Sequence, residues 1–522
     1  MVVVDRDSHV PGRSLWRTIK TKSNDKHHFS FKNSHKDPFI STSAYCTQGV
    51  AENFGSNRIA NVNRNRIFRK DKILNEPIIS VSGLRGIIGH TLTPEIAVRY
   101  TAAYATTLPA GQIVVTRDGR TTGRMLADTI VNCLVGLGRD VLDGDIAATP
   151  TTGVLVRHHQ CAGGIQITAS HNPPEYNGMK LFGNDGRILS ASLGEKVSEI
   201  YRHADPPSTQ PDSLGHARRL DNTTDQHLQL VLDTINAEQI RDCHFHVLLD
   251  SNHGSGGLLG RRLLDELGCQ VELVGSEPTG LFAHLPEPTE TNLSSTAQRV
   301  AETEVDIGFC QDPDADRLAV IDEQGRYIGE EYTLVLCLDH VLRKHPGNVV
   351  TNCSTSRMSQ DLAEKYGCQM IRTAVGEANV TDGMIQRQAV FGGEGSGGPI
   401  DPRVGYVRDS FVGMALILDA MADRQQSISR IVKELPGYAI FKTKVELDRE
   451  QIDKALTALA NHFADAQISR LDGLRMDWPD KWLLVRASNT EPIVRLIAEA
   501  PADIEAKQLC EQASKIIALT TN

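Results

Sequence analysis

Three aspartates at alternating positions in one short segment carry the strongest chemical signal in this sequence. Asp312, Asp314 and Asp316 follow the apolar run 305–309, which is typical of a buried strand. Carboxylates spaced in this way in a tight loop direct their oxygen atoms toward one hard cation, Mg²⁺ or Ca²⁺. Without a cation, clustered buried carboxylates repel one another. The segment therefore predicts a divalent metal site, and a solvated acidic turn is the weaker alternative.

A calcium-binding EF-hand loop is a further alternative for the same segment. Glu323 stands at the twelfth position, where such a loop carries a bidentate glutamate. The sixth position, however, is Arg317 instead of the required glycine, and residues 318–321 are typical of a strand. These two features exclude an EF-hand.

A second segment places a serine directly after a short apolar strand. Ser170 lies in the loop 168–174, which follows the run 164–167 and contains a Pro-Pro pair that forbids a helix there. Open α/β sheets bind their ligands at the carboxyl ends of strands. Lys180 stands ten residues further on, where its charge suits a phosphorylated hydroxyl or a proton transfer. For this segment alone, an ordinary turn is the favoured interpretation, and the other loops described below reverse it.

Two glycine-rich loops supply further polar groups. The loop 82–86 presents Arg85 between glycines, and a guanidinium with nearby backbone amides suits a phosphate. The loop 392–398 offers Glu394 and Ser396, which suit the recognition of sugar hydroxyls. This loop also matches G-x-G-x-x-G, but the prolines after it prevent the helix that a dinucleotide-binding motif must open.

The last polar loop, 486–492, combines a guanidinium, hydroxyls and an amide, a composition that suits a phosphate. A polar hairpin is the alternative. Its candidate phosphate ligands, together with one arginine in the following strand, are Arg486, Ser488, Asn489, Thr490 and Arg495.

Strands alternate with helices three times along the chain, which predicts three α/β units with largely parallel sheets. Loops are expected at 148–152 and 374–379 between these elements. The last ~90 residues change to a small α+β pattern. The length of 522 residues predicts three or four domains of ~100–200 residues each. The expected strands are 78–81, 112–116, 140–142, 164–167, 246–250, 305–309, 348–351, 369–373, 389–391, 441–447 and 482–485. The expected helices include 93–107, 258–267, 331–343, 357–366 and 450–463. The expected segments are a basic, disordered leader at 1–75 and domains at 76–210, 211–328, 329–435 and 436–522.

Composition and charge exclude several classes of protein. Residues 1–70 hold 13 Lys+Arg against 5 Asp+Glu, whereas the remaining chain holds 42 against 60. An acidic body argues against a nucleic-acid-binding surface. The longest apolar runs are far shorter than the ~20 residues of a membrane span. Ten cysteines without a C-x-x-C pair predict reduced thiols in a cytoplasmic protein.

The four loops together resemble the active-site loops of the α-D-phosphohexomutase superfamily. The segments 168–174, 312–317, 392–398 and 486–492 occur in the order of that family, and the resemblance extends from about Pro77 to the C-terminus. It implies an α/β protein with four domains around a central cleft. Three of these would be similar mixed α/β domains, and the fourth a smaller C-terminal α+β domain.

The resemblance also implies a role for each candidate residue. Ser170 becomes the phosphoserine and, with Asp312, Asp314 and Asp316, contributes to one Mg²⁺ site. Arg85, His171 and Lys180 lie beside the phosphoserine, with Lys180 as a proton shuttle. The substrate, a phosphosugar, contacts Arg317, Glu394, Ser396, Arg486, Ser488, Asn489, Thr490 and Arg495. A sugar 1,6-bisphosphate acts as activator, and the expected assembly is a monomer or homodimer without nucleic-acid or membrane partners.

The preferred sugar rests on details of three loops. The form of 392–398, together with 375–380 and 82–86, resembles phosphoglucosamine mutases, although many bacterial relatives carry histidine where this chain has Gly398. A phosphomannomutase/phosphoglucomutase is the close alternative. A phosphatase with a phosphoserine intermediate and a non-catalytic sugar-phosphate sensor are more distant ones. The phosphatase needs no separate sugar and phosphate loops, and the sensor needs no nucleophile.

Overall fold

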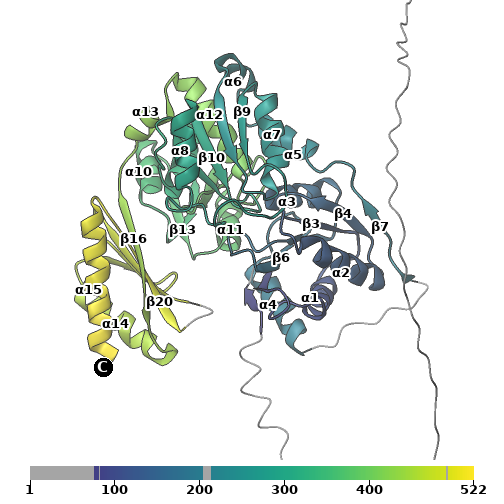
Figure 1. Ribbon diagram of the computed structural model, residues 1–522. Coiled ribbons are helices and arrows are strands. Elements are labelled where there is room, and N and C mark those ends of the chain that lie inside the picture. Colours follow the sequence, from purple (N-terminus) through teal and green to yellow (C-terminus); the bar gives the residue numbers. More distant parts are fainter. Residues whose placement is uncertain (1–75, 81–82, 204–212, 489–491, 522) are drawn as a thin grey trace, which may run out of the picture. The chain divides into compact units, whose positions relative to one another are not determined.

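The computed structural model describes residues 76–80, 83–203, 213–488 and 492–521, which form four β-sheets with flanking helices (Figure 1). The expected leader at 1–75 lies outside the described residues. Within the described ranges, no helix is long and apolar enough to cross a membrane. The nine cysteines in these ranges are free thiols.

The first sheet combines parallel and antiparallel strands. Its strands are β1 (Ile78–Ser80), β2 (Gly83–Ile87), β3 (Ile113–Arg117), β4 (Val141–Ile146), β5 (Gly163–Ile167), β6 (Tyr176–Phe182) and β7 (Ala217–Arg219). They are ordered β1-β2-β6-β5-β3-β4-β7, and β5, β3, β4 and β7 are parallel. β6 is antiparallel to β5 because residues 168–174, called the serine loop below, join the two strands directly, without a crossover helix. The sheet is therefore mixed, whereas the alternation of strands and helices predicted a largely parallel one.

Helices cover both faces of this sheet. They are α1 (Pro94–Thr107), α2 (Gly123–Gly136), α3 (Thr149–His158) and α4 (Ala191–His203). Along β3, Ile113 and Val115 pack in the core with α1 and α2, while Val114 packs against α3 on the opposite face. The continuous apolar run of β3 thus fits a strand that is buried on both sides. Helix α1 begins as predicted, because the Thr93 hydroxyl accepts the Ile96 N–H and proline suits the first turn.

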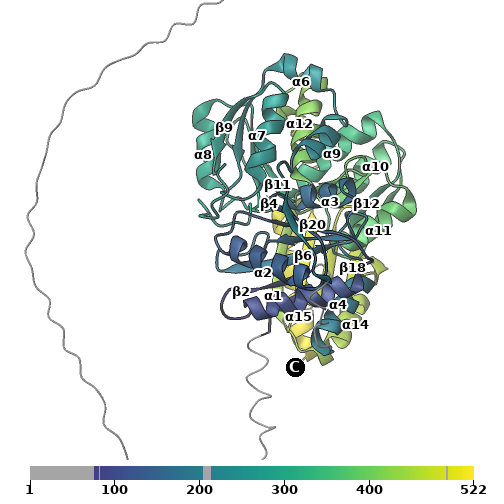
Figure 2. The same ribbon diagram turned by 90° about the vertical axis from the view of Figure 1, so that its right-hand side faces the viewer.

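The second sheet follows the same two-sided pattern in the order β11-β10-β8-β9. Its strands are β8 (His246–Asp250), β9 (Gln270–Val274), β10 (Ile307–Gln311) and β11 (Leu318–Asp322); the helices are α5 (Asp225–Leu232), α6 (Ala237–Cys243), α7 (Gly256–Glu266) and α8 (Ser294–Thr303). Figure 2 shows α7 and α8 on either side of this sheet. Val247 and Leu249 pack toward α7, and Leu248 packs toward Val300 of α8. The loop with the three aspartates, residues 312–317 and called the metal loop below, joins the antiparallel strands β10 and β11.

The third sheet contains the glycine-rich loop 392–398, called the sugar loop below. Its order is β13-β12-β14-β15, formed by β12 (Val349–Asn352), β13 (Met370–Thr373), β14 (Phe391–Glu394) and β15 (Gly398–Ile400). The adjoining helices are α9 (Glu330–Lys344), α10 (Met358–Lys365), α11 (Glu377–Arg387), α12 (Ser410–Arg424) and α13 (Ile428–Lys433). Helices α9 and α12 share one apolar core with α7 of the second sheet. This shared core fixes the metal loop near the sugar loop.

The C-terminal sheet is antiparallel, with the order β16-β20-β19-β18-β17. It consists of β16 (Ala439–Glu446), β17 (Gln467–Ser469), β18 (Leu474–Asp477), β19 (Trp482–Ala487) and β20 (Ile493–Ala500), with α14 (Ile452–His462) and α15 (Asp503–Thr521). Both helices pack on one face of the sheet (Figure 1). Trp482 and Leu484 on the other face pack against Cys353, which follows β12. These elements confirm the predicted α+β unit.

Three predicted loops are wrong in detail. Residues 83–86 belong to strand β2 because they pair with β6; Gly83 lies so close to β6 that an added Cβ would meet the Met179 carbonyl oxygen at 1.9 Å. The predicted loop 148–152 is largely the first turn of α3, and α11 begins within the predicted loop 374–379. In these places glycine and proline mark element starts or tight strand pairing instead of loops.

Candidate active site

The serine loop holds Ser170 in a defined, buried position at the end of β5. Its φ is 51°, in the left-handed region that few non-glycine residues adopt. The Ser170 N–H donates to the Thr168 hydroxyl at 2.8 Å, and the Ser170 hydroxyl donates to Asp312 Oδ2 at 2.9 Å. The predicted nucleophile thus lies directly beside the predicted metal loop, although the two are 142 residues apart.

A buried arginine that the sequence analysis missed fixes the shape of this loop. The Arg120 guanidinium donates to the carbonyl oxygens of Ser170, Asn172, Pro173 and Tyr176 at 2.6–2.9 Å. Only the planar, multi-donor guanidinium satisfies this many acceptors at once. In the sequence, Arg120 stands in a short turn after β3, and its local pattern is that of an ordinary solvated turn.

The three aspartates of the metal loop form one cluster. Asp312, Asp314 and Asp316 are fully buried, and one carboxylate oxygen from each lies within 4.8 Å of the others. Oδ1 of Asp314 and Oδ1 of Asp316 are buried without a hydrogen-bond partner among the described residues. Hard oxygen ligands left without donors in this way suit a divalent cation. The geometry of the cluster therefore supports the predicted metal site.

Lys180 Nζ, on β6, also lies in this cluster. It is 2.6 Å from Asp314 Oδ2 and 2.5 Å from Asp316 Oδ2. Although burial opposes it, the two carboxylates raise the pKa of Lys180. Burial also tends to raise the pKa of Asp316, but Arg408 and Lys180 outweigh it and lower that pKa. Burial and the neighbouring carboxylates raise the pKa of Asp312. Lys180 is therefore held protonated within the cluster.

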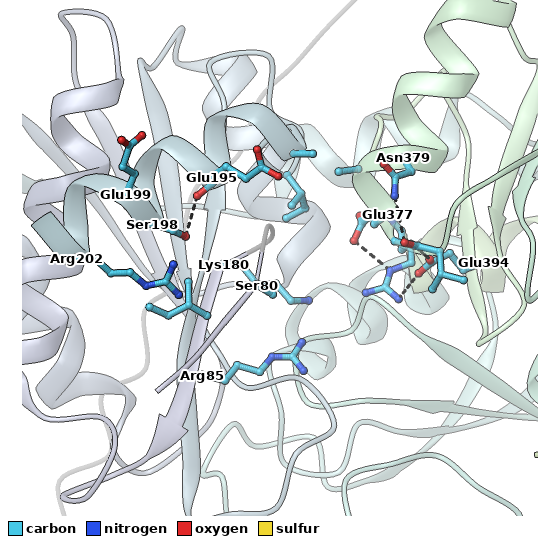
Figure 3. A pocket seen from close by; sticks show the side chains of 18 of the residues that line it. Ser80, Arg85, Lys180, Glu195, Ser198, Glu199, Arg202, Glu377, Asn379 and Glu394 are labelled. Atoms are coloured by element: carbon cyan, nitrogen blue, oxygen red, sulfur yellow. Dashed lines mark hydrogen bonds and ion pairs between the residues drawn. The ribbon is translucent and has the colours of Figure 1, made fainter. Parts of the chain in front are cut away.

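Arg85 and His171 line the approach to Ser170. Arg85 Nη1 donates to Asn172 Oδ1 at 3.1 Å, and His171 Nδ1 is 3.3 Å from Ser170 Oγ. Burial and the nearby Arg317 and Arg85 charges lower the pKa of His171, so the ring is neutral at physiological pH. Arg85 and Lys180 line a cavity of about 640 Å³. Figure 3 shows both side chains pointing into it. The structure thus brings the predicted catalytic residues together.

A second missed residue, Arg408, connects the metal loop to the sugar loop. Its guanidinium donates to Asp316 Oδ2 at 2.7 Å, to Glu394 Oε2 at 2.9 Å and to Glu377 Oε2 at 3.2 Å. An added Cβ at Gly398 would meet Arg408 Cδ at 2.4 Å, so position 398 must be glycine for the arginine to lie there. Arg408 precedes α12 in an irregular segment, where nothing in the local sequence sets it apart.

Glu394 lies at the end of β14 and is held from both sides. Its Oε1 accepts the side-chain amide of Asn352 at 2.8 Å and the Gly376 N–H at 3.3 Å, while Arg408 holds Oε2. Glu394 lines the 640 Å³ cavity and also a neighbouring cavity of about 590 Å³. It therefore borders both the cavity that contains Arg85 and Lys180 and the cavity that contains Ser396. The second cavity is lined by, among others, Arg317, Glu394, Ser396, Lys442, Lys444 and Arg495.

The C-terminal loop is only partly assembled as predicted. Arg486 and Arg495 are directly opposite each other on β19 and β20, and Arg495 lines the 590 Å³ cavity. Arg486 Nε instead lies 3.1 Å from Asp472 Oδ2. Ser488 lines a separate, smaller cavity with Arg449. The predicted ligands Asn489 and Thr490 lie outside the described residues.

Comparisons with known proteins match this arrangement along most of the chain. Four segments match the domains of phosphoglucomutase/phosphomannomutase: alpha/beta/alpha domain I at 77–207, domain II at 225–325, domain III at 330–438 and the C-terminal domain at 443–516. A phosphoglucomutase/phosphomannomutase of Thermococcus kodakarensis is 36% identical over 444 residues, covering 83% of this chain and 97% of that protein. A probable phosphoglucosamine mutase of Thermococcus gammatolerans is 33% identical over 441 residues, covering 84% and 97%.

Among solved structures, a phosphoglucomutase/phosphomannomutase family protein from Burkholderia thailandensis superposes with a TM-score of 0.74. The two sequences are 26% identical, and the match covers 85% of this chain and 99% of that one. The fold and the order of the domains thus agree with the same family.

Proposed function

Since this chain belongs to the phosphoglucomutase/phosphomannomutase family and is a phosphohexomutase, we propose that it interconverts glucosamine 6-phosphate and glucosamine 1-phosphate. Several relatives that match 84% of this chain, over 96–97% of their own length, are named probable phosphoglucosamine mutase. The sugar loop has the form expected of that group. A phosphoglucomutase/phosphomannomutase is the second candidate, because the relative at 36% identity carries that name.

One observation carries the proposed chemistry: the Ser170 hydroxyl contacts Asp312 within a cluster of three buried carboxylates. Serine is a weak nucleophile that needs an adjacent base or metal. The three carboxylates would hold Mg²⁺, which when bound neutralises charge on a transferring phosphoryl group. The serine loop, the metal loop, the sugar loop and the C-terminal loop would come from the proposed domains 76–210, 211–328, 329–435 and 436–522.

In the proposed reaction, Ser170 carries a phosphoryl group on Oγ. The bond from phosphorus to Oγ breaks as a bond forms to a sugar hydroxyl oxygen. Lys180 donates a proton to Ser170 Oγ and takes one from the attacking hydroxyl, so it ends the step protonated. Arg85 stabilises charge on the phosphoryl oxygens. Transfer of the phosphoryl group at the other end of the sugar 1,6-bisphosphate back to Ser170 completes the isomerisation, and for this reason we propose that bisphosphate as the activator.

The substrate is held across the second cavity. Glu394 and Ser396 accept and donate hydrogen bonds with sugar hydroxyls, and Arg317 lies beside them in the same wall. Arg495, which lines this cavity, binds the phosphate that does not react. Arg486, Ser488, Asn489 and Thr490 remain its further ligands as the resemblance implies. Guanidinium groups suit this role because they offer paired donors to phosphate oxygens. We propose a monomer or homodimer with no further macromolecular partner.

Turnover assays of the full chain with Mg²⁺ test this function. Glucosamine 1-phosphate, mannose 1-phosphate and glucose 1-phosphate are supplied separately with a catalytic amount of the matching 1,6-bisphosphate. We expect glucosamine 1-phosphate to lead in kcat/KM by ~100-fold. Comparable rates with all three sugars would favour the broader hexomutase. The absence of isomerisation with any sugar would contradict the proposal.

Replacing Gly398 with alanine tests the link between Arg408 and the sugar loop. The added Cβ displaces the Arg408 side chain and loosens Glu394, so we expect kcat/KM to fall ~10- to 100-fold. Steady-state kinetics measure this fall, and thermal unfolding confirms that the variant is folded. Gly136→Ala is the matched control, because an added Cβ there meets nothing within 4 Å. Equal activities of the two variants would show that Arg408 does not position Glu394.

A further inference from the structure

A second carboxylate lies against the sugar loop and has no role in the mechanism above. Glu331 is the second residue of α9 and lines the same 590 Å³ cavity as Glu394 and Ser396. A Cβ added to Gly395 would meet Glu331 Oε2 at 1.9 Å and Oε1 at 2.2 Å. The carboxylate therefore occupies the space next to Gly395, between the two predicted hydroxyl-binding residues of the loop. A side chain at position 395 would therefore displace the Glu331 carboxylate from this place.

The Glu331 carboxylate is incompletely neutralised. The Ser356 N–H donates to its Oε2 at 3.0 Å, but among the described residues no lysine, arginine or histidine forms an ion pair with it. The neighbouring Glu330 instead pairs with Lys442, whose Nζ is 2.8 Å from Glu330 Oε1. Burial raises the pKa of Glu331 to about 8, against the opposing effects of Lys442 and of the Ser356 N–H. With this pKa the carboxyl is largely protonated near pH 7 when no ligand is bound, and a cationic group placed against it would favour the charged carboxylate.

The cations of the same cavity serve a different purpose. Arg317, Lys442, Lys444 and Arg495 also line it, and such groups suit the phosphate of a sugar phosphate. A neutral hexose offers Glu331 only hydroxyl donors. A hexosamine offers a protonated amine, which makes stronger, charge-assisted hydrogen bonds with a carboxylate. The cavity therefore combines a phosphate-binding part with an acidic part beside the sugar loop.

We propose that Glu331 is the residue that selects amino sugars, by accepting hydrogen bonds from the ammonium group of a hexosamine phosphate. This inference rests on the proposed mutase function and specifies its substrate class. It assigns selectivity to a side chain on α9, outside the four loops. Glu394 and Ser396 then recognise hydroxyls that amino and neutral hexoses share.

The test is the ratio of kcat/KM for glucosamine 1-phosphate to that for glucose 1-phosphate, measured for the parent and Glu331→Gln. Glutamine keeps the size of the side chain and one acceptor oxygen but removes the negative charge. We expect the ratio to fall ~10- to 100-fold, because the ammonium loses its ion pair with a carboxylate and keeps only a hydrogen bond to a neutral amide oxygen. The rate with glucose 1-phosphate should change far less. A merely structural role would lower both rates together and leave the ratio unchanged.

Glu330→Gln is the matched control, since it removes the same charge one residue away, from a side chain that pairs with Lys442. Any effect through Lys442 should act on both sugars alike and preserve the ratio. Glu331→Asp provides the second variant if Glu331→Gln does not fold: withdrawing the carboxylate by one methylene should lower the ratio several-fold.

The outcomes distinguish a failure of the proposed mutase function from a failure of the proposed role of Glu331. A parent that isomerises neither sugar contradicts the proposed function itself. An active parent whose ratio is unchanged in a folded Glu331→Gln or Glu331→Asp variant overturns only the role of Glu331. A lower ratio in the Glu331 variants and an unchanged ratio in Glu330→Gln support it.

Discussion

Ser170→Ala is expected to lower mutase kcat/KM by at least ~10⁴-fold, the largest effect of any single replacement in this chain. The variant loses the only atom that forms the proposed covalent bond with the phosphoryl group. The remaining residues still bind substrate, so the affinity for sugar phosphate should change far less than the rate. Coupled assays measure the rate, and calorimetry measures the affinity for glucosamine 6-phosphate.

The fold should tolerate this replacement. The loop is held by Arg120 through backbone carbonyls and by the Ser170 N–H, none of which depends on the serine hydroxyl. Intact-protein mass spectrometry should detect one phosphoryl group on the parent and none on Ser170→Ala. Ser192→Ala, at an exposed position on α4, should keep both the phosphoryl group and the activity. A Ser170→Ala variant as active as the parent would refute the phosphoserine mechanism and favour a different nucleophile.

Lys180→Met is expected to show the second-largest effect, a fall in kcat of ~10²- to 10⁴-fold, which is the usual contribution of a proton-transfer group. The same replacement removes the lysine charge from the aspartate cluster. The three carboxylates then repel one another unless a cation is bound. Added Mg²⁺ should therefore raise the melting temperature of Lys180→Met by more than it raises that of the parent.

Two measurements check this expectation together. Thermal unfolding is followed with and without Mg²⁺, and kcat is determined at saturating Mg²⁺. Lys196→Met, on the exposed face of α4, is the control for the loss of one positive charge. If Lys180→Met retains parental kcat, Lys180 transfers no proton. If Mg²⁺ stabilises the variant and the parent equally, the lysine does not share the site of the cation.

The sequence alone predicted the residues whose signal is local. Asp312, Asp314 and Asp316 follow a buried strand in one loop, so strand pattern and spacing suffice to single them out. The same holds for Glu394 and Ser396, because glycines and prolines around them exclude a dinucleotide site. Ser170 follows another strand, but its loop alone resembles an ordinary turn, and only the combination of the four loops identified it. The pattern of apolar residues also predicted most strands and helices, since a buried strand and an amphipathic helix each require a characteristic spacing of apolar residues in the sequence.

The tertiary structure alone decided which distant groups meet. Arg120 and Arg408 lie in irregular segments. Arg120 nevertheless holds the serine loop through carbonyl oxygens 50 to 56 residues away, and Arg408 connects the sugar loop to Asp316, 92 residues away. Arg85 lies on a strand because β2 pairs with β6, which no local glycine pattern reveals. In the sequence, Glu331 is an ordinary acidic residue in the first turn of a helix, and only the structure shows that it lies against Gly395. Such contacts form between chain segments that pack together only in the folded protein, so they cannot be predicted from a local sequence pattern.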